Sequence, residues 1–240
     1  MHCSAQNLYF CAKIRKNNLI ETCFYFFLYL CDENNYFVYM YRDPEHLEQL
    51  KNDIRVLATN EFIRKGVKAV KMNDLAQTLR ISKRTIYEIY KDKESLLFAV
   101  IKHQIQDENL SLRKYYETHN AIETIVEFYN RQVAKSLKVN PIFYKELHSY
   151  VRVIEYLKKK HEERHNNGIA FFENGVKDGY FKDNVNFRVS LSVIDCTLAN
   201  MRNDNQFDSM TVESLFRNYI LVMVRGMCTQ KGLEMLDKLL

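Results

Sequence analysis

Side chains that donate hydrogen bonds or carry positive charge are crowded into the segment SKRTIYEIY, residues 82–90. Lysine and arginine can donate to phosphate oxygens or to the edges of guanine, and hydroxyl groups can donate to phosphates. So many polar groups in so short a stretch are not typical of a segment buried in a folded core. The segment therefore predicts a surface for a negatively charged partner, formed by Ser82, Lys83, Arg84, Thr85, Tyr87 and Tyr90.

A second pattern that could support chemistry is HEERH, residues 161–165. On a helix this spacing places His161 and His165 on one face with Glu162 between them, as in zinc peptidases. The flanking sequences YLKKK and NNG are polar, and no third ligand is evident. A zinc-dependent hydrolase built on His161, Glu162 and His165 stays an alternative interpretation, as does incidental metal binding at the surface.

The rest of the sequence contains no catalytic set. It has no G-x-S-x-G motif, no glycine-rich phosphate loop and no carboxylates clustered in an apolar setting. The six cysteines include no C-x-x-C pair, which indicates reduced thiols rather than a zinc site. We therefore expect a protein that is not an enzyme, binds no metal or cofactor and is cytoplasmic.

Membrane insertion is not expected either. The most apolar run, CFYFFLYLC at residues 23–31, has nine residues, whereas a spanning helix needs about 20. Residues 1–39 as a whole are rich in Tyr, Phe, Cys and Asn and lack sustained helical periodicity. They are interpreted as an atypical N-terminal extension. Two explanations stay open: a start assigned too early, with Met40 as the true start, or a genuine appendage.

The elements that position the cationic segment are expected to be helices. Only six Gly and two Pro occur in 240 residues, which is too few turn residues for a sheet-rich fold. Apolar residues make up 47%, enough for a sizeable core. The net charge of +5 is too modest to indicate nucleic-acid binding by itself. The composition predicts an all-α protein.

Three short helices are expected around the cationic segment. The first covers residues 47–65 and ends at Gly66, the second covers 73–80 with Asn73 as its cap, and the third covers 83–90. A tight turn at residues 80–81 joins the last two, which makes a helix-turn-helix at about 71–90. In such a unit the N-terminal residues of the second helix of the pair enter the major groove of DNA.

Charge and capping support this interpretation. Residues 71–93 include six Lys or Arg and three acidic residues, which gives a local net charge of +3. Ser82 is a favourable N-cap for the third helix and Asp92 for a fourth. The expected DNA contacts are Lys71, Ser82, Lys83, Arg84, Thr85, Tyr87, Tyr90 and Lys93. Surface lysines and arginines are often merely solvated, and Tyr90 could equally be a core aromatic residue.

The segment VKMNDLAQTLRISKRTIYEIYKDKESLLFAVI, residues 70–101, resembles the DNA-binding domain of the TetR (tetracycline-repressor-like) regulators. The resemblance extends over about 47–107. Two positions depart from the family pattern: Arg80 stands where glycine is usual in the turn, and Arg84 replaces a small residue. The resemblance rests on Asp74, Leu75, Ala76, Leu79, Ser82, Lys83, Thr85, Ile86, Tyr87, Tyr90, Lys93, Glu94, Leu96 and Leu97.

The resemblance implies a three-helix helix-turn-helix domain at 47–107 followed by a helical ligand-binding and dimerisation domain at 108–240. It also implies a function, as a sequence-specific transcriptional regulator. The expected partners are a palindromic double-stranded DNA operator, a small-molecule effector that releases the repressor, and a second copy in a homodimer. A DNA-binding protein without sequence preference stays an alternative.

The C-terminal region offers weaker signals. Apolar periodicity predicts helices at 121–138, 141–160, 162–178, 186–202, 211–228 and 231–239, with a break at NNG, residues 166–168. Aromatic residues and one histidine on the central helices are candidates for an effector pocket, although such residues are more often core: Phe128, Tyr129, Phe143, Tyr144, His148, Phe171 and Phe172. Wide apolar stripes on the last long helices are candidates for the dimer interface or for internal core: Leu191, Ile194, Leu198, Tyr219, Met223 and Met227.

Overall fold

The computed structural model describes residues 44–203 and 211–240. It divides into two compact units, Met1–Asp53 and Ile54–Leu240, with the boundary inside the first described helix, α4 (Pro44–Lys65). The expected extension at 1–39 lies outside the described residues. Every other described element belongs to the second unit.

The described part of the chain is helical, and its one β-type pairing is the single bridge between Phe181 and Cys228. None of the described helices is long and apolar enough to cross a bilayer. The expected all-α class is confirmed. The second unit contains the end of α4 and α5 (Met72–Thr78), α6 (Lys83–Ile89), α7 (Lys93–Tyr116), α8 (Ala121–Ser136), α9 (Pro141–Leu147), α10 (Val151–Lys177), α11 (Phe187–Asn203), α12 (Val212–Leu215), the π-helical turn η2 (Phe216–Ile220), α13 (Leu221–Met227) and α14 (Gln230–Leu239).

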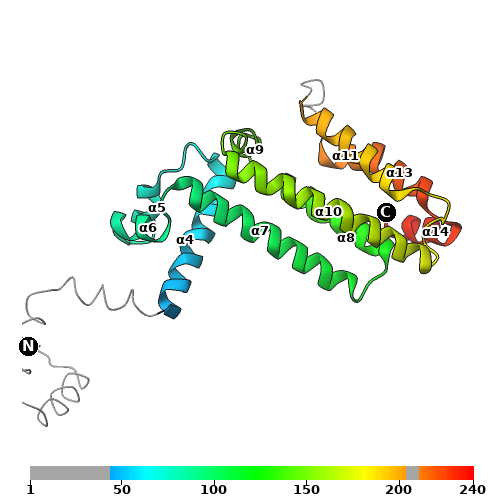
Figure 1. The fold of residues 1–240 in the computed structure, drawn as a ribbon, viewed down its shortest axis with the longest axis horizontal. Helices are drawn as coiled ribbons and strands as arrows, with labels where there is room; N and C mark the ends of the chain where they lie inside the picture. The colour runs from blue at the N-terminus through cyan, green and yellow to red at the C-terminus, as the bar shows by residue number, and fades with distance from the viewer. Residues whose placement is uncertain (1–43, 204–210) are drawn as a thin grey trace, which may run out of the picture. The chain divides into compact units, whose positions relative to one another are not determined.

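Two long helices form the spine of this unit. Figure 1 shows α7 and α10 running side by side, with α11 and α13 along the C-terminal part of α10 and α14 at that end. The C-terminal core is a cluster of apolar side chains from these helices and from α8: Ala121, Ile122, Val126, Phe172, Phe181, Phe187, Val224, Met227, Cys228 and Leu236. The boundary expected near residue 107 falls inside α7, so one continuous helix serves both regions.

Local sequence signals explain where most helices begin. The side chains of Ser82, Asp92 and Thr229 each accept a backbone N–H from the first turn of the helix that follows. Asn120 and Glu123 form a reciprocal capping box at the start of α8, which satisfies two N–H groups that the helix itself leaves unpaired. Helix α5 begins one residue earlier than expected: its N-cap is Lys71 rather than Asn73, and no side chain caps it.

The expected break at residues 166–168 is wrong. Helix α10 has 27 residues in all and passes through NNG without a break. Gly168 serves close packing rather than a turn. A Cβ at Gly168 would lie 3.2 Å from Leu191 Cδ1 on α11, so the glycine lets the two helices approach. The chain breaks instead at residues 148–150, where no glycine or proline marks the turn.

Candidate nucleic-acid interface

Helix α6 has one face turned into the protein and one turned outward. Thr85 and Ile86 are buried, whereas Lys83, Arg84 and Tyr87 are exposed. The side chain of Arg84 is 88% accessible. The buried pair anchors a seven-residue helix that could not persist alone in water, because isolated short helices are marginal. The outward face is therefore a fixed cationic surface.

The two hydroxyl groups at the start of α6 are used internally. Ser82 Oγ accepts the Thr85 N–H at 3.0 Å, and the two hydroxyl oxygens lie 2.8 Å apart. The expected N-cap at Ser82 is thus present. Thr85, which we expected to offer its hydroxyl to a phosphate, is instead buried and hydrogen-bonded to the cap. Its role in this arrangement is to fix the beginning of α6.

The turn between α5 and α6 contains one residue in a strained backbone conformation. Arg80 has a φ of 55°, the left-handed region that favours glycine. The turn is closed by hydrogen bonds from Arg80 N to Gln77 O at 3.1 Å and from Ile81 N to Ala76 O at 3.0 Å. A non-glycine residue in this conformation costs on the order of 1 kcal/mol. The side chain of Arg80 adds a further exposed cation close to α6.

The exposed cations on α6 are held loosely. Arg84 Nε donates to Glu88 Oε1 at 2.7 Å, one helical turn away, and this hydrogen bond raises the pKa of the arginine. Lys83 Nζ lies 5.9 Å from the centre of the Tyr87 ring. Exposed contacts of this kind contribute little to stability and exchange readily for a stronger partner. Lys83 and Arg84 are thus available to a polyanion that approaches α6.

Lys93 differs from the expectation that it would contact phosphate. Its ammonium donates to Val67 O at 3.0 Å, to Val70 O at 3.0 Å and to Lys68 O at 3.3 Å. Burial in this position lowers the pKa of Lys93. The side chain is thus bound to the connection between α4 and α5 instead of pointing toward an external partner. Of the other expected contacts, Lys71 is exposed and Tyr90 is half-buried.

The helix-turn-helix lies within a region that matches a known family. Residues 54–100 match the model of the bacterial regulatory proteins of the tetR family. We refer to residues 54–100 as the tetR-type domain. They include most of α4, all of α5 and α6 and the start of α7, which are the elements that present the cationic face.

Solved structures share the fold well beyond the tetR-type domain. A protein from Saccharomonospora viridis, described as a transcriptional regulator in complex with choline, superimposes with a TM-score of 0.61 at 13% identity, over 76% of this chain and 100% of that one. A TetR-family regulator from Agrobacterium tumefaciens gives 0.59 at 13% identity, over 76% and 99%. One from Cytophaga hutchinsonii gives 0.57 at 11% identity, over 76% and 96%. No curated protein sequence matches the chain significantly.

The residues expected to line an effector pocket lie in different environments. Phe143 and Phe172 are buried, and Tyr129 is stacked on Phe216 with ring centres 3.6 Å apart. Tyr144 and His148 are exposed, Phe128 is at the surface, and Phe171 is half-buried beside Tyr116 and Phe172. The rings thus belong partly to the core and partly to the surface, and their assignment to a pocket stays a prediction.

The expected dimer residues are mostly turned inward. Ile194 and Met227 are buried, and Leu191 packs on the C-terminal core. Leu198, Tyr219 and Met223 are half-buried. The exposed apolar residues of these helices stand one or two positions away, at Val189 and Val193 on α11 and Val222 on α13. Sequence periodicity found the apolar helices but could not separate the inward stripe from its outward neighbours.

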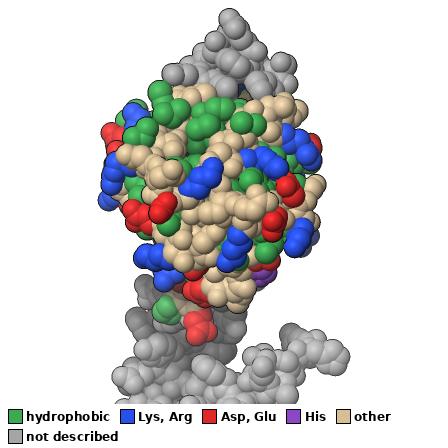
Figure 2. Space-filling model, turned by 90° about the vertical axis from the view of Figure 1, so that its right-hand side faces the viewer, with side chains coloured by type: hydrophobic (Ala, Val, Ile, Leu, Met, Phe, Trp, Pro, Cys, Tyr) green, Lys and Arg blue, Asp and Glu red, His purple; other side chains and the backbone are tan. Residues whose placement is uncertain are grey.

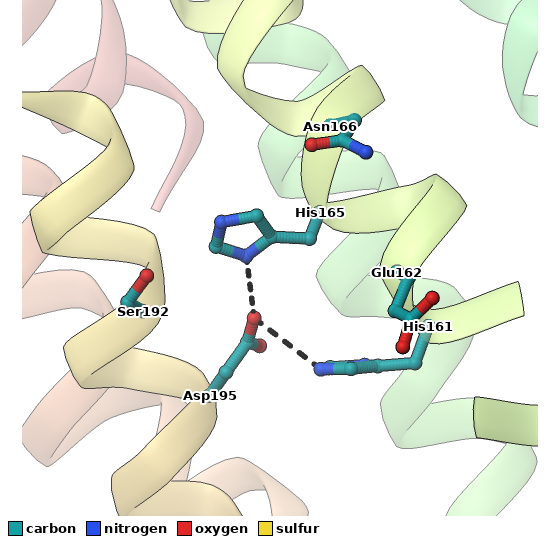
Figure 3. Close-up of a pocket in the computed structure, with 6 residues that line it drawn as sticks. All are labelled: His161, Glu162, His165, Asn166, Ser192 and Asp195. Atoms are coloured by element: carbon teal, nitrogen blue, oxygen red, sulfur yellow. Dashed lines mark hydrogen bonds and ion pairs between the residues drawn. The ribbon is translucent and has the colours of Figure 1, made fainter. Parts of the chain in front are cut away.

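The HEERH motif lies on α10 and faces α11. His165 Nδ1 donates to Asp195 Oδ2 at 2.8 Å, and His161 Nε2 lies 3.4 Å from the same oxygen. Figure 3 shows both imidazole rings turned toward Asp195 in an open hollow whose other lining residues are Glu162, Asn166 and Ser192. Within the described residues, no group of three or more His, Cys, Asp or Glu is arranged to hold a metal ion. The two histidines join α10 to α11.

Proposed function

We propose that this protein is a repressor that binds a palindromic operator as a homodimer and is released by a small ligand. The observation that supports operator binding most directly is the division of α6. Its buried side fixes the helix to the tetR-type domain, and its exposed side carries Lys83 and Arg84. In helix-turn-helix proteins the helix at this position enters the major groove.

Two copies are needed for this mode of binding. A single seven-residue helix reads only a few base pairs, whereas two helices related by a two-fold axis read both halves of a palindrome. Val189 and Val193 on α11 and Val222 on α13 offer an exposed apolar surface for the second copy. Figure 2 shows hydrophobic side chains grouped toward the top of the view, the side on which Figure 1 places α11 and α13.

Release by a ligand requires a difference in affinity between two conformations. A ligand that prefers the conformation unsuited to the operator weakens DNA binding by that preference. We place the effector in the helical region at 108–240, whose fold is shared with a protein described in complex with choline. Compounds that raise the unfolding temperature and also lower operator affinity would identify it.

The test of operator binding uses the full chain and DNA from upstream of its own gene, titrated by fluorescence anisotropy against an excess of random duplex. Specific binding should survive the competitor. Lys83→Ala and Arg84→Ala should each weaken it by about 1–3 kcal/mol and alter the base preference. The matched control is Lys158→Ala on the exposed surface of α10, which should bind as the parent does.

Binding that random DNA competes away equally would favour the alternative, a DNA-binding protein without sequence preference. If both α6 variants retain the parent affinity, the assignment of α6 as the reading helix is wrong. A zinc-dependent hydrolase is not proposed, because within the described residues no group of three or more His, Cys, Asp or Glu is arranged to hold a metal ion.

A further inference from the structure

Helix α9 is attached to the end of α4 by its first residues. The backbone N–H of Asn140 donates to Ile63 O at 2.9 Å, and its side-chain amide donates to Arg64 O at 3.2 Å. The amide oxygen of Asn140 meanwhile accepts the Ile142 N–H and caps α9. One asparagine thus begins α9 and satisfies two of the carbonyl groups that the C-terminus of α4 leaves unpaired.

A second attachment comes from Glu146, near the other end of α9. Its Oε2 accepts the backbone N–H of Lys68 at 2.8 Å, a hydrogen bond between residues 78 positions apart. Gly66, which ends α4 with a φ of 84°, lies directly beneath: a Cβ there would be 2.9 Å from Glu146 Oε2 and 2.9 Å from Ile142 Cγ2. Helix α9 therefore packs against bare backbone.

Lys93 holds the same connection from the side of α7. Its three hydrogen bonds go to the carbonyl groups of Val67, Lys68 and Val70, and Glu146 is close enough to favour its charged form. The connection at residues 66–71 therefore has three of its carbonyl groups bound by a cation and one N–H group bound by a carboxylate. We call Asn140, Glu146 and Lys93 the polar clasp.

The connection at residues 66–71 leads directly into the two helices of the helix-turn-helix. Val67 and Val70 are buried, and α5 begins at Met72, immediately after the connection. The turn from α5 to α6 is closed by its own hydrogen bonds. A displacement of residues 66–71 would therefore be carried into α5 and α6 together.

We propose that Glu146 is a positioning residue for operator recognition. Through the Lys68 N–H it holds the connection at 66–71, and thereby α5 and α6, in register with α9. The inference rests on the proposed operator binding. It also gives α9, which lies outside the tetR-type domain, a direct mechanical connection to the reading helix.

The clasp itself is tested without DNA, by amide hydrogen exchange of the full chain. Glu146→Ala should speed the exchange of the Lys68 amide at least tenfold and leave α10 unchanged. Glu146→Gln retains an acceptor oxygen and should stay near the parent rate. Glu155→Ala, on the exposed surface of α10, is the matched control and should change neither region. Parent-like exchange at Lys68 in Glu146→Ala would overturn the clasp.

The positioning role is tested by operator affinity in the same variants. Glu146→Ala should weaken specific binding about five- to twentyfold, with the salt dependence of the parent because no phosphate contact is lost. Glu146→Gln should retain most of the operator affinity of the parent. If Glu146→Ala does not fold, Glu146→Asp, which keeps the charge but withdraws the carboxylate, decides in its place.

The outcomes separate the two proposals. A parent protein that shows no specific binding overturns the repressor assignment and, with it, the positioning role. Specific binding by the parent that is equally strong in Glu146→Ala, despite faster exchange at Lys68, overturns the positioning role alone. A steeper or flatter salt dependence in Glu146→Ala would also contradict it, because it would indicate a changed number of phosphate contacts.

Discussion

At the scale of single residues, the tetR-type domain combines exposed cations with internal hydrogen bonds at neighbouring positions. Lys83 and Arg84 are exposed, while Thr85, the next residue, is buried and bound to Ser82. Lys93 carries the same charge as Lys83, but its ammonium group donates hydrogen bonds to three backbone carbonyl groups. Residue type alone therefore does not separate a candidate DNA contact from a part of the scaffold.

Arg80 offers a test of the strain in the turn. Its φ of 55° is unfavourable for a residue with a Cβ, so Arg80→Gly should raise the free energy of unfolding by about 0.5–1 kcal/mol, after allowance for the greater freedom of glycine in the unfolded chain. Urea denaturation measures this change. Arg80→Ala removes the same charge but keeps the Cβ and should show no such gain. Equal stability of the two variants would mean that the turn is not strained by the Cβ.

At the scale of elements, glycines mark close approaches at least as often as they mark turns. Gly168 lies inside α10 opposite Leu191, and Gly175 lies so close to the Phe181 ring that a Cβ would be 2.5 Å from it. Gly66 combines a left-handed turn with a close approach by α9. The packing of α10 therefore depends on backbone approach, which no local pattern of hydrophobicity reveals.

Two glycines near the C-terminus should respond oppositely to alanine. A Cβ at Gly232 would lie 2.3 Å from the carbonyl oxygen of Tyr180, which is backbone and cannot rotate away, so Gly232→Ala should cost about 1–3 kcal/mol. Gly226 has open space around its Cβ position. Gly226→Ala should leave stability unchanged or raise it by up to about 1 kcal/mol through helix propensity.

Urea denaturation of both variants, at a concentration at which the parent has one oligomeric state, makes the comparison. Stability of Gly232→Ala equal to that of Gly226→Ala would contradict the close approach of α14 to the Tyr180 carbonyl.

At the scale of the whole molecule, the proposed mechanism needs a second copy of the chain, and this can be tested through α11. Val193→Asp places a charge in the exposed apolar surface and should shift the protein toward monomer and reduce operator affinity. Light scattering coupled to size exclusion measures the mass. Val151→Asp, which places the same charge on an exposed valine of α10, is the matched control.

If Val193→Asp remains dimeric, the dimer interface lies elsewhere on the protein. A monomeric parent that still binds a palindrome tightly would instead contradict the proposed mode of binding itself.

The sequence was sufficient to predict the helix-turn-helix because the capping and turn signals that define it are local. The caps at Ser82 and Asp92, the turn at Arg80 and the end of α4 at Gly66 each depend on residues within one helical turn. The predictions for α9 and α10 were less accurate. The break at 148–150 carries no glycine or proline, and the NNG segment lies inside α10, where Gly168 packs against a residue that is distant in sequence.

By itself, the sequence determined the all-α class, the position of the helix-turn-helix and the cationic face of α6. Residue preferences, capping and periodicity indicate these features because they depend on residues close together in the sequence. Tertiary structure alone decided that Lys93 is bound internally, that Leu191 and Ile194 face the core, and that Glu146 reaches the backbone of Lys68. Those features depend on contacts between residues 23 to 78 positions apart, and the packing of a whole core fixes which faces meet.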